Sequence, residues 1–333
     1  MQRYLTARTV ILCAAVLTAF AAAARAGETR SNGTEKENRF LRLVRGDDQR
    51  PVALQAAIVR CTSAEDGKKG LTVDLVAAVH VAERSYYQTL NREFAKHDAV
   101  LYELVAPQGT RVPRGGAHSG GSPVSLLQHG MKNVLELQFQ LEEIDYTREN
   151  MVHADMSPDQ FTDSMRRRGE SVFSMFFRMF GYALAQQSRS GGKSADGQLL
   201  VALFDKNRAL ALKRVMAEQF EDMDGMLLAL DGPDGSTMIS ERNKVAIAAL
   251  RKQIAVGKQN LAIFYGAGHM PDLLKRLRDD FGLVPVHTRW LTAWNLKSPQ
   301  KQPSQQEQLP PEKPPADGSQ DHEPLVEAGT AEK

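Results

Sequence analysis

The chain has 333 residues, with 42 lysines and arginines against 40 aspartates and glutamates, which gives a formal net charge of +2. A chain so close to neutrality has no electrostatic attraction for a polyanion, so we expect no nucleic-acid partner. It contains only two cysteines, Cys13 and Cys61, and stability must therefore come from a packed core rather than from a disulfide framework.

The first 26 residues predict an export signal. A mostly apolar run, residues 10–23, lies between Arg8 and Arg25, and Ala24-Arg25-Ala26 fits a cleavage site of small residues. The run is shorter than the roughly 20 residues that a membrane-spanning helix needs, which favours a cleaved signal over a retained anchor. Cleavage would remove three arginines and Cys13, leaving 39 basic residues against 40 acidic ones. We expect an exported protein, periplasmic or extracellular, with no transmembrane span after removal of the signal.

Composition divides the remainder into three parts. Residues 27–50 are polar and predict a flexible N-terminal segment, and residues 297–333 are rich in Pro, Gln, Glu and Lys and predict a disordered C-terminal tail. The intervening residues 51–296 have a length that one α/β domain can occupy.

The first half of this domain alternates between strand and helix. Residues 52–61 and 71–79 are apolar runs separated by a turn-forming cluster, which predicts a hairpin. Residues 82–96 carry apolar positions at helical spacing, and residues 99–105 predict a further strand. A strand, helix and strand in this order imply a parallel pair with a right-handed crossover.

The second half is mainly helical before a final pair of strands. We expect helices over residues 123–143, 157–168, 171–184, 199–223, 236–256 and 270–279, and strands over residues 261–265 and 284–294. The predicted fold class is therefore α/β, with a central mixed, largely parallel sheet flanked by helices and a helical insertion in the middle.

Three residues with nitrogen or carboxylate donors follow predicted strands. His80 and His269 each come directly after one, and Glu103 lies near the end of another. Ligands bind outside the carboxyl ends of the strands in open parallel sheets, so we expect these side chains to share one rim. Gly266 and Gly268 would let the backbone turn sharply and come close to a ligand.

Two chemistries stay open for this trio. Two imidazoles and one carboxylate can hold a divalent metal ion that lowers the pKa of a bound water. The same groups without metal can work as a general-base pair, in which one histidine activates water and the carboxylate orients an imidazole. A lone histidine at a strand end is also often a satisfied core residue.

The sequence resembles the TraB/GumN superfamily, which includes PrgY and the Tiki metalloproteases. The resemblance rests on Gly266-Ala-Gly-His269, on Tyr102-Glu103-Leu104 and on Ile239-Ser-Glu-Arg-Asn243. The first family motif departs here, because Ala77 stands where the family has glycine in Ala77-Ala-Val-His80. The resemblance implies a fold similar to the erythromycin esterase and ChaN groups.

The resemblance also implies a function. We expect an exported hydrolase in which His80, Glu103 and His269 activate water for attack on an unidentified peptide or small-molecule substrate. The resemblance implies that this chemistry is metal-dependent and peptidase-like. The alternative is a non-catalytic protein on the same scaffold that binds a haem-like ligand or a partner. The metal's identity and the oligomeric state are left open.

Further candidates surround this trio. Arg242 and Asn243 either clamp a carboxylate or oxyanion, or belong to a solvated helix face. Tyr265 either presents its hydroxyl to the cleft or is buried by strand alternation. His153 and Asp155 are candidate supplementary ligands or substrate contacts, although Asp155 also fits a cap of the helix that starts near Ser157.

Overall fold

The computed structural model describes residues 40–63, 70–110, 112–115, 135–171, 201–202, 204–221, 231 and 234–298. The predicted signal peptide, residues 27–39, nearly all of the predicted helix 171–184 and nearly all of the tail lie outside these residues. Residues 41–45 belong to the segment predicted to be flexible, but they form a strand that pairs with residues 51–56, so that part of the prediction is wrong. The chain divides into two units between Lys297 and Ser298, and the elements below all belong to the first unit.

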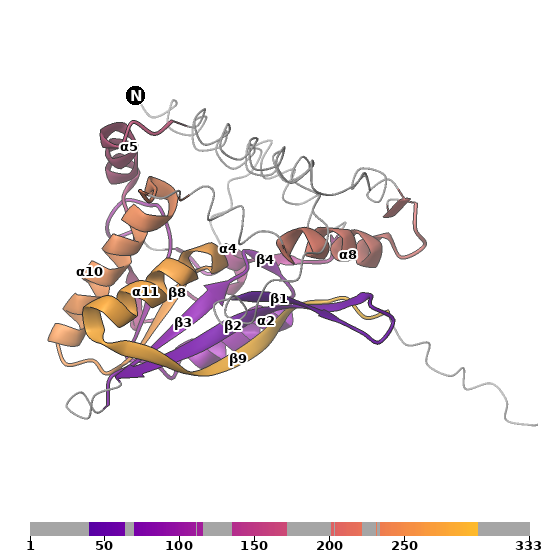
Figure 1. Cartoon of the computed structure of the whole chain (residues 1–333), viewed down its shortest axis with the longest axis horizontal. Coiled ribbons are helices and arrows are strands. Elements are labelled where there is room, and N and C mark those ends of the chain that lie inside the picture. The colour runs from indigo at the N-terminus through magenta and orange to yellow at the C-terminus, as the bar shows by residue number, and fades with distance from the viewer. Residues whose placement is uncertain are drawn as a thin grey trace, which may run out of the picture. The chain divides into compact units, whose positions relative to one another are not determined.

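One sheet organises this unit (Figure 1). Its strands are β1 (Leu41–Arg45), β2 (Pro51–Ser63), β3 (Thr72–Ala78), β5 (Ala99–Tyr102), β7 (Met151–His153), β8 (Asn260–Gly266) and β9 (Leu283–Asn295). They follow the order β1-β2-β3-β8-β5-β7, and β9 also pairs with β2. Strands β3, β8, β5 and β7 are parallel to one another, whereas β1, β3 and β9 run antiparallel to β2. The α/β class and the mixed, mostly parallel sheet flanked by helices are therefore shown.

The parallel half of the sheet is covered on both faces. All four residues of β5 are buried, and six of the seven in β8 are buried. Such continuous apolar strands need helices on each side. The predicted hairpin of β2 and β3 is present. The predicted parallel relation of β3 and β5 is also present, but the two strands are not neighbours, because β8 lies between them.

The remaining elements are helices and one small two-stranded sheet. The α-helices are α2 (Arg84–Phe94), α4 (Gln140–Glu143), α5 (Pro158–Arg167), α8 (Arg208–Glu221), α10 (Arg242–Ala255) and α11 (Met270–Phe281). A π-helical turn, η3 (Thr237–Glu241), precedes α10, and a 3-10 turn, η4 (Ala267–His269), precedes α11. Strands β4 (Val81–Ala82) and β6 (Gln138–Phe139) form the small sheet. Across the described residues, no helix is both long and apolar enough to pass through a membrane.

Opposite faces of the sheet carry different helices. Phe94 of α2 packs against Phe264 of β8, with ring centroids 4.8 Å apart. The next residue, Tyr265, points to the other face and packs against His269 at the start of α11. Helices α10 and α11 contact each other and the parallel strands on that second face, where Figure 1 shows them beside β8.

Two predicted helices differ from the structure. In the described part of residues 123–143, a strand and a four-residue helix replace the single helix. Residues 201–202 are helical, as predicted, but a turn over residues 204–207 interrupts the predicted helix before α8 begins at Arg208, and there Asp205 accepts a hydrogen bond from the backbone N–H of Asn207. Helix α5 matches its prediction, with Ser157 as N-cap in a complete capping box.

An ion cluster forms around the buried carboxylate of Asp74, toward the end of β3 that lies farther from His80. Asp74 of β3 accepts two hydrogen bonds of 2.8 Å from Arg60 of β2 and one of 3.0 Å from His97. Burial by itself would raise the pKa of Asp74, but the hydrogen bonds from Arg60 and His97 outweigh it and lower the pKa to about 2. The cluster therefore stabilises the fold through an ionised carboxylate.

Replacing Asp74→Asn is expected to lower the free energy of unfolding by about 2 kcal/mol, because the buried His97 and the half-exposed Arg60 lose their anionic hydrogen-bond partner. Urea denaturation at pH 7 measures this. The matched control is Asp163→Asn, which removes an exposed pair with Arg166 and should change stability by less than about 1 kcal/mol. Equal effects of the two substitutions would contradict the assignment.

Candidate functional site

The strand ends bring the candidate residues to one edge of the sheet. In the parallel ladder Ala78 of β3 pairs with Gly266 of β8, and Tyr102 of β5 pairs with Phe264. His80, Glu103 and His269 each follow one of these three strands within three residues. The carboxyl ends of the three strands therefore carry all three side chains, as the sequence predicts.

Gly266 is the point on which the three side chains converge. A Cβ atom at this position would lie 3.3 Å from Glu103 Oε2, 3.4 Å from His80 Nε2 and 3.8 Å from His269 Cδ2. The φ angle of Gly266 is −50°, which any residue adopts, so space rather than backbone conformation favours glycine here. The sequence predicts that the backbone at Gly266 approaches a ligand closely, and in the structure it closely approaches the candidate side chains themselves.

Glu103 is held as a buried carboxylate. Its Oε1 accepts a 2.6 Å hydrogen bond from Arg242 Nη2, and its Oε2 accepts one of 2.6 Å from the backbone N–H of Gly266. Burial by itself would raise the pKa of Glu103. The charges of Arg242, His269 and His80, together with the Gly266 hydrogen bond, outweigh this and hold the pKa far below its usual range.

Arg242 bridges two carboxylates from different parts of the chain. Its Nε and Nη2 donate to Asp155 at 3.0 and 2.6 Å in a bidentate pair, while Nη2 also reaches Glu103. Asp155 is fully buried and Arg242 is 6% exposed. The interpretation of Arg242 as part of a solvated helix face is therefore wrong. The carboxylates that Arg242 binds belong to the protein itself.

Asn243 holds both the ring and the backbone of His269. Its Oδ1 lies 2.8 Å from His269 Nδ1, and its Nδ2 donates to the backbone carbonyl of His269 at 3.1 Å and to Asp272 at 2.8 Å. Because an amide oxygen only accepts, His269 carries its proton on Nδ1 and leaves Nε2 with a lone pair. That nitrogen lies 3.5 Å from both Glu103 Oε1 and Arg242 Nη1.

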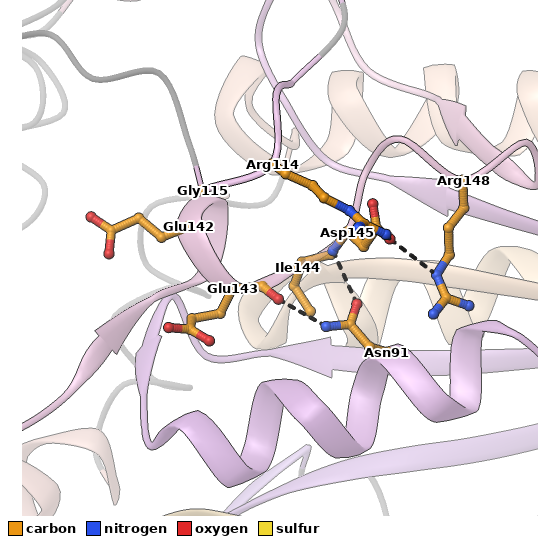
Figure 2. A pocket seen from close by; sticks show the side chains of 8 residues that line it. All are labelled: Asn91, Arg114, Gly115, Glu142, Glu143, Ile144, Asp145 and Arg148. Atoms are coloured by element: carbon orange, nitrogen blue, oxygen red, sulfur yellow. Dashed lines mark hydrogen bonds and ion pairs between the residues drawn. The ribbon is translucent and has the colours of Figure 1, made fainter.

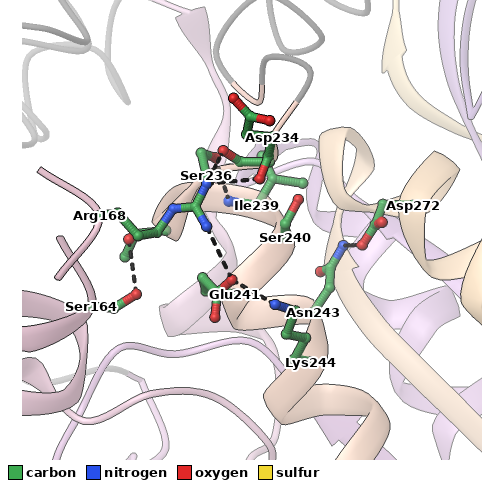
Figure 3. A network of polar contacts seen from close by, with 12 residues as sticks. Ser164, Arg168, Asp234, Ser236, Ile239, Ser240, Glu241, Asn243, Lys244 and Asp272 are labelled. Carbon is green, nitrogen blue, oxygen red and sulfur yellow. Dashed lines mark hydrogen bonds and ion pairs between the residues drawn. The ribbon is translucent and has the colours of Figure 1, made fainter. Parts of the chain in front are cut away.

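A polar network surrounds η3 and the start of α10, where Asn243 lies (Figure 3). Arg168, at the end of α5, donates to Glu241 at 3.4 Å and to the backbone carbonyl of Asp234 at 2.8 Å. Ser236 caps η3 through the N–H of Ile239. The π-helical turn η3 then changes the register before α10, and such turns occur often at functional sites.

His80 is the exposed member of the group. Its Nδ1 lies 2.9 Å from Gln140 Oε1, and its carbonyl accepts a 2.9 Å hydrogen bond from the Gln140 backbone N–H. No sequence motif points to Gln140, which lies in a segment predicted to be a plain helix. His80 therefore combines a fixed ring with access from solvent.

Other candidates lie around this cluster with different contacts. The hydroxyl of Tyr265 donates to the Ala154 carbonyl at 2.5 Å, and the residue is fully buried, so alternation along β8 turns it into the core. His153 Nε2 lies 2.6 Å from the carbonyl oxygen of Leu104, so this ring contacts the segment that follows β5. Ala77 lies inside β3, buried, and Gly268 lies in η4.

The predicted helix cap at Asp155 is wrong. Ser157, not Asp155, caps α5, because Asp155 is drawn into the ion pair with Arg242. A long-range donor therefore outcompetes the local helix end.

The donor types would suit a divalent metal, but their placement does not. Both oxygens of Glu103 already accept strong hydrogen bonds, and the guanidinium of Arg242 contacts both Glu103 Oε1 and His269 Nε2. Arginine is always charged, so it would repel a second cation at this point. Within the described residues no group of three His, Cys, Asp or Glu side chains is arranged to hold a metal ion.

A scan against protein-family models found no match for this chain, and searches of curated proteins and of solved structures found none either.

Replacing Arg242→Met is expected to lower the free energy of unfolding by about 3–5 kcal/mol, because it leaves Glu103 and Asp155 buried without a cation. Chemical denaturation at pH 7 measures this. Lys244→Met is the matched control on the same helix, since Lys244 makes only an exposed pair with Glu241 and should contribute less than about 1 kcal/mol. A small effect at Arg242 would show that the cluster is not what holds these segments together.

Acid is expected to destabilise the protein through His269. Burial lowers the pKa of His269 to about 4 from its usual 6.5; the negative charge of Glu103 opposes this shift and Arg242 reinforces it. Between pH 6.5 and 4 the unfolded chain therefore takes up a proton that the folded protein refuses, and stability falls by about 3 kcal/mol as the pH drops through this window.

Urea unfolding of the wild type and of His269→Gln, measured from pH 7 to pH 4, tests this. The substituted protein should lose less stability over the window, and His287→Gln, at an exposed position of β9, should follow the wild type. Parallel curves for the wild type and His269→Gln would contradict the buried, neutral state of His269.

Proposed function

We propose that this chain is an exported hydrolase of the TraB/GumN type in which His80 is the general base that activates water. The observation that carries the proposal is the convergence of His80 Nε2, Glu103 and His269 around Gly266. The resemblance in sequence motifs adds to it, and the finer likeness to the erythromycin esterase and ChaN fold belongs to the same proposal. The bond that is cleaved lies in a peptide, an ester or an amide.

The residues around Gly266 are rich in hydrogen-bond acceptors. His269 presents an Nε2 lone pair, Glu103 is ionised, and His80 presents its own Nε2 toward the same point. Water has two hydrogens to donate, so such a set can hold one water molecule and keep its oxygen lone pair free for attack. The exposure of His80 lets a substrate approach the same place.

Each group then has a defined task in the proton transfer. His80 Nε2 takes the proton as water attacks the substrate, and the imidazolium that forms is stabilised by the negative charge of Glu103. Arg242 and the Gly266 N–H keep Glu103 ionised and fixed in place. His80 later returns the proton to the leaving group.

The metal that the resemblance implies remains a separate prediction. Metal binding by Glu103 and His269 would need Arg242 to withdraw from Glu103 Oε1, where its bond is 2.6 Å long. Elemental analysis of the purified protein tests this, with Arg242→Met as a comparison.

Activity measurements on a panel of peptide, ester and amide substrates test the function. His80→Asn is expected to lower kcat/KM by about 10²- to 10⁴-fold while the protein stays folded, because the general base is lost. His287→Asn, at an exposed histidine of β9, should retain wild-type activity.

Two results would contradict the hydrolase proposal. Turnover that is equal in the wild type and in His80→Asn would remove the role of His80. Stoichiometric binding of haem or of another small ligand, without turnover of any substrate in the panel, would favour the binding protein that the sequence leaves as the alternative.

A further inference from the structure

His80 is joined to Gln140 by both its backbone and its side chain. The backbone N–H of Gln140 donates to the His80 carbonyl, and Gln140 Oε1 lies 2.9 Å from His80 Nδ1. Gln140 is only 4% exposed, so its amide has no water to exchange with and depends on protein partners.

The amide of Gln140 is held in turn by Tyr146. Gln140 Nε2 lies 2.9 Å from the Tyr146 hydroxyl, and Tyr146 packs against Tyr102 with ring centroids 4.8 Å apart. The turn between them is fixed from α2, because Asn91 donates to the Glu143 carbonyl at 2.8 Å and accepts from the Asp145 N–H at 3.0 Å. Figure 2 shows Asn91 reaching this turn at the edge of a pocket of about 320 Å³.

The segment that carries His80 is equally constrained. Strand β4, which begins at Val81, pairs with β6 directly before Gln140. The Tyr87 hydroxyl donates to the Val79 carbonyl at 2.9 Å, and Trp294 Nε1 donates to the Val81 carbonyl at 2.7 Å. The residues on both sides of His80 are therefore anchored, and the contact between His80 and Gln140 joins two fixed segments.

We propose that Gln140 is a positioning residue that sets the tautomer of His80, with Tyr146 holding its amide in the required orientation. An amide oxygen can only accept, so the bond to Gln140 Oε1 places the proton of neutral His80 on Nδ1. The lone pair then lies on Nε2, the nitrogen that points toward Gly266. This inference rests on the proposed role of His80 as base.

The contact matters because Glu103 favours the opposite tautomer. Its carboxylate lies on the Nε2 side of His80, and a negative charge attracts a proton to the nearer nitrogen. Without an acceptor at Nδ1, the proton of neutral His80 would move to Nε2, and the nitrogen that must accept the proton of water would already be occupied. Gln140 thus opposes the effect of Glu103 on the tautomer of His80.

The ¹⁵N shifts and ¹H–¹⁵N couplings of the His80 ring measure the tautomer directly at about pH 8.5, where an ordinary imidazole is neutral. His80→Asn identifies the His80 signals by their loss. Gln140→Met has nearly the same length and removes the acceptor, while Gln140→Glu keeps an acceptor oxygen. Gln138→Met, two residues earlier on β6, is the matched control.

We expect the Nδ1–H tautomer in the wild type, in Gln140→Glu and in Gln138→Met. In Gln140→Met the population should move to Nε2–H, and Tyr146→Phe should give an intermediate population, because the amide of Gln140 is then free to turn. On a substrate identified with the wild type, Gln140→Met should lower kcat at least about 10-fold with KM unchanged, and Gln140→Glu should recover part of that loss.

An Nε2–H tautomer in the folded wild type, or an unchanged tautomer in a folded Gln140→Met protein, would overturn the proposal. Circular dichroism and thermal unfolding establish that each variant is folded. The tautomer is measured without substrate, so failure of the hydrolase proposal and failure of the proposed role of Gln140 are seen in different measurements. A wild type that shows the expected tautomer but turns over nothing would count against hydrolysis and leave the role of Gln140 intact.

Discussion

The hydrogen-bonded ion cluster of Glu103, Arg242 and Asp155 is the interaction on which the rest of the site depends. It joins the end of β5, the segment after β7 and the first residue of α10 within 3.0 Å contacts. Charges buried this deeply are tolerated only when each has its partner, so the three segments must assemble together. The cluster thereby fixes the carboxylate that His80 and His269 face, and places Asn243 where it can hold His269.

The parts of this arrangement that follow from local chemistry could be predicted from the sequence. Mostly apolar residues in β3 and β8 mark buried strands, and a histidine placed just beyond each strand must lie at the same edge when the strands are parallel. The helix bounds of α5 follow from Ser157 and its capping box for the same reason, since a cap is an interaction among neighbouring residues.

The parts that depend on distant pairs could not be predicted. His80 and Gln140 are 60 residues apart, and Arg242 and Asp155 are 87 apart. Asp155 has the local pattern of a helix cap, and only the arrival of a guanidinium from α10 gives it another role. The insertion of β8 between β3 and β5 is of the same kind, because strand order in a sheet is decided by long-range packing that hydropathy does not record.

The identity of the buried cation decides how the proposed reaction must work. A guanidinium next to Glu103 stabilises that carboxylate, but it cannot coordinate water as a Lewis acid does, and its own proton is not available at neutral pH. The attacking water must therefore be activated by a lone pair. His269 is held in the interior with a pKa of about 4 and is a weak base. His80 is exposed, and its Nε2 faces the carboxylate that would stabilise the imidazolium, so this nitrogen is the one that can accept the proton of water. The proposed reaction therefore also depends on Gln140, whose contact with Nδ1 leaves Nε2 unprotonated.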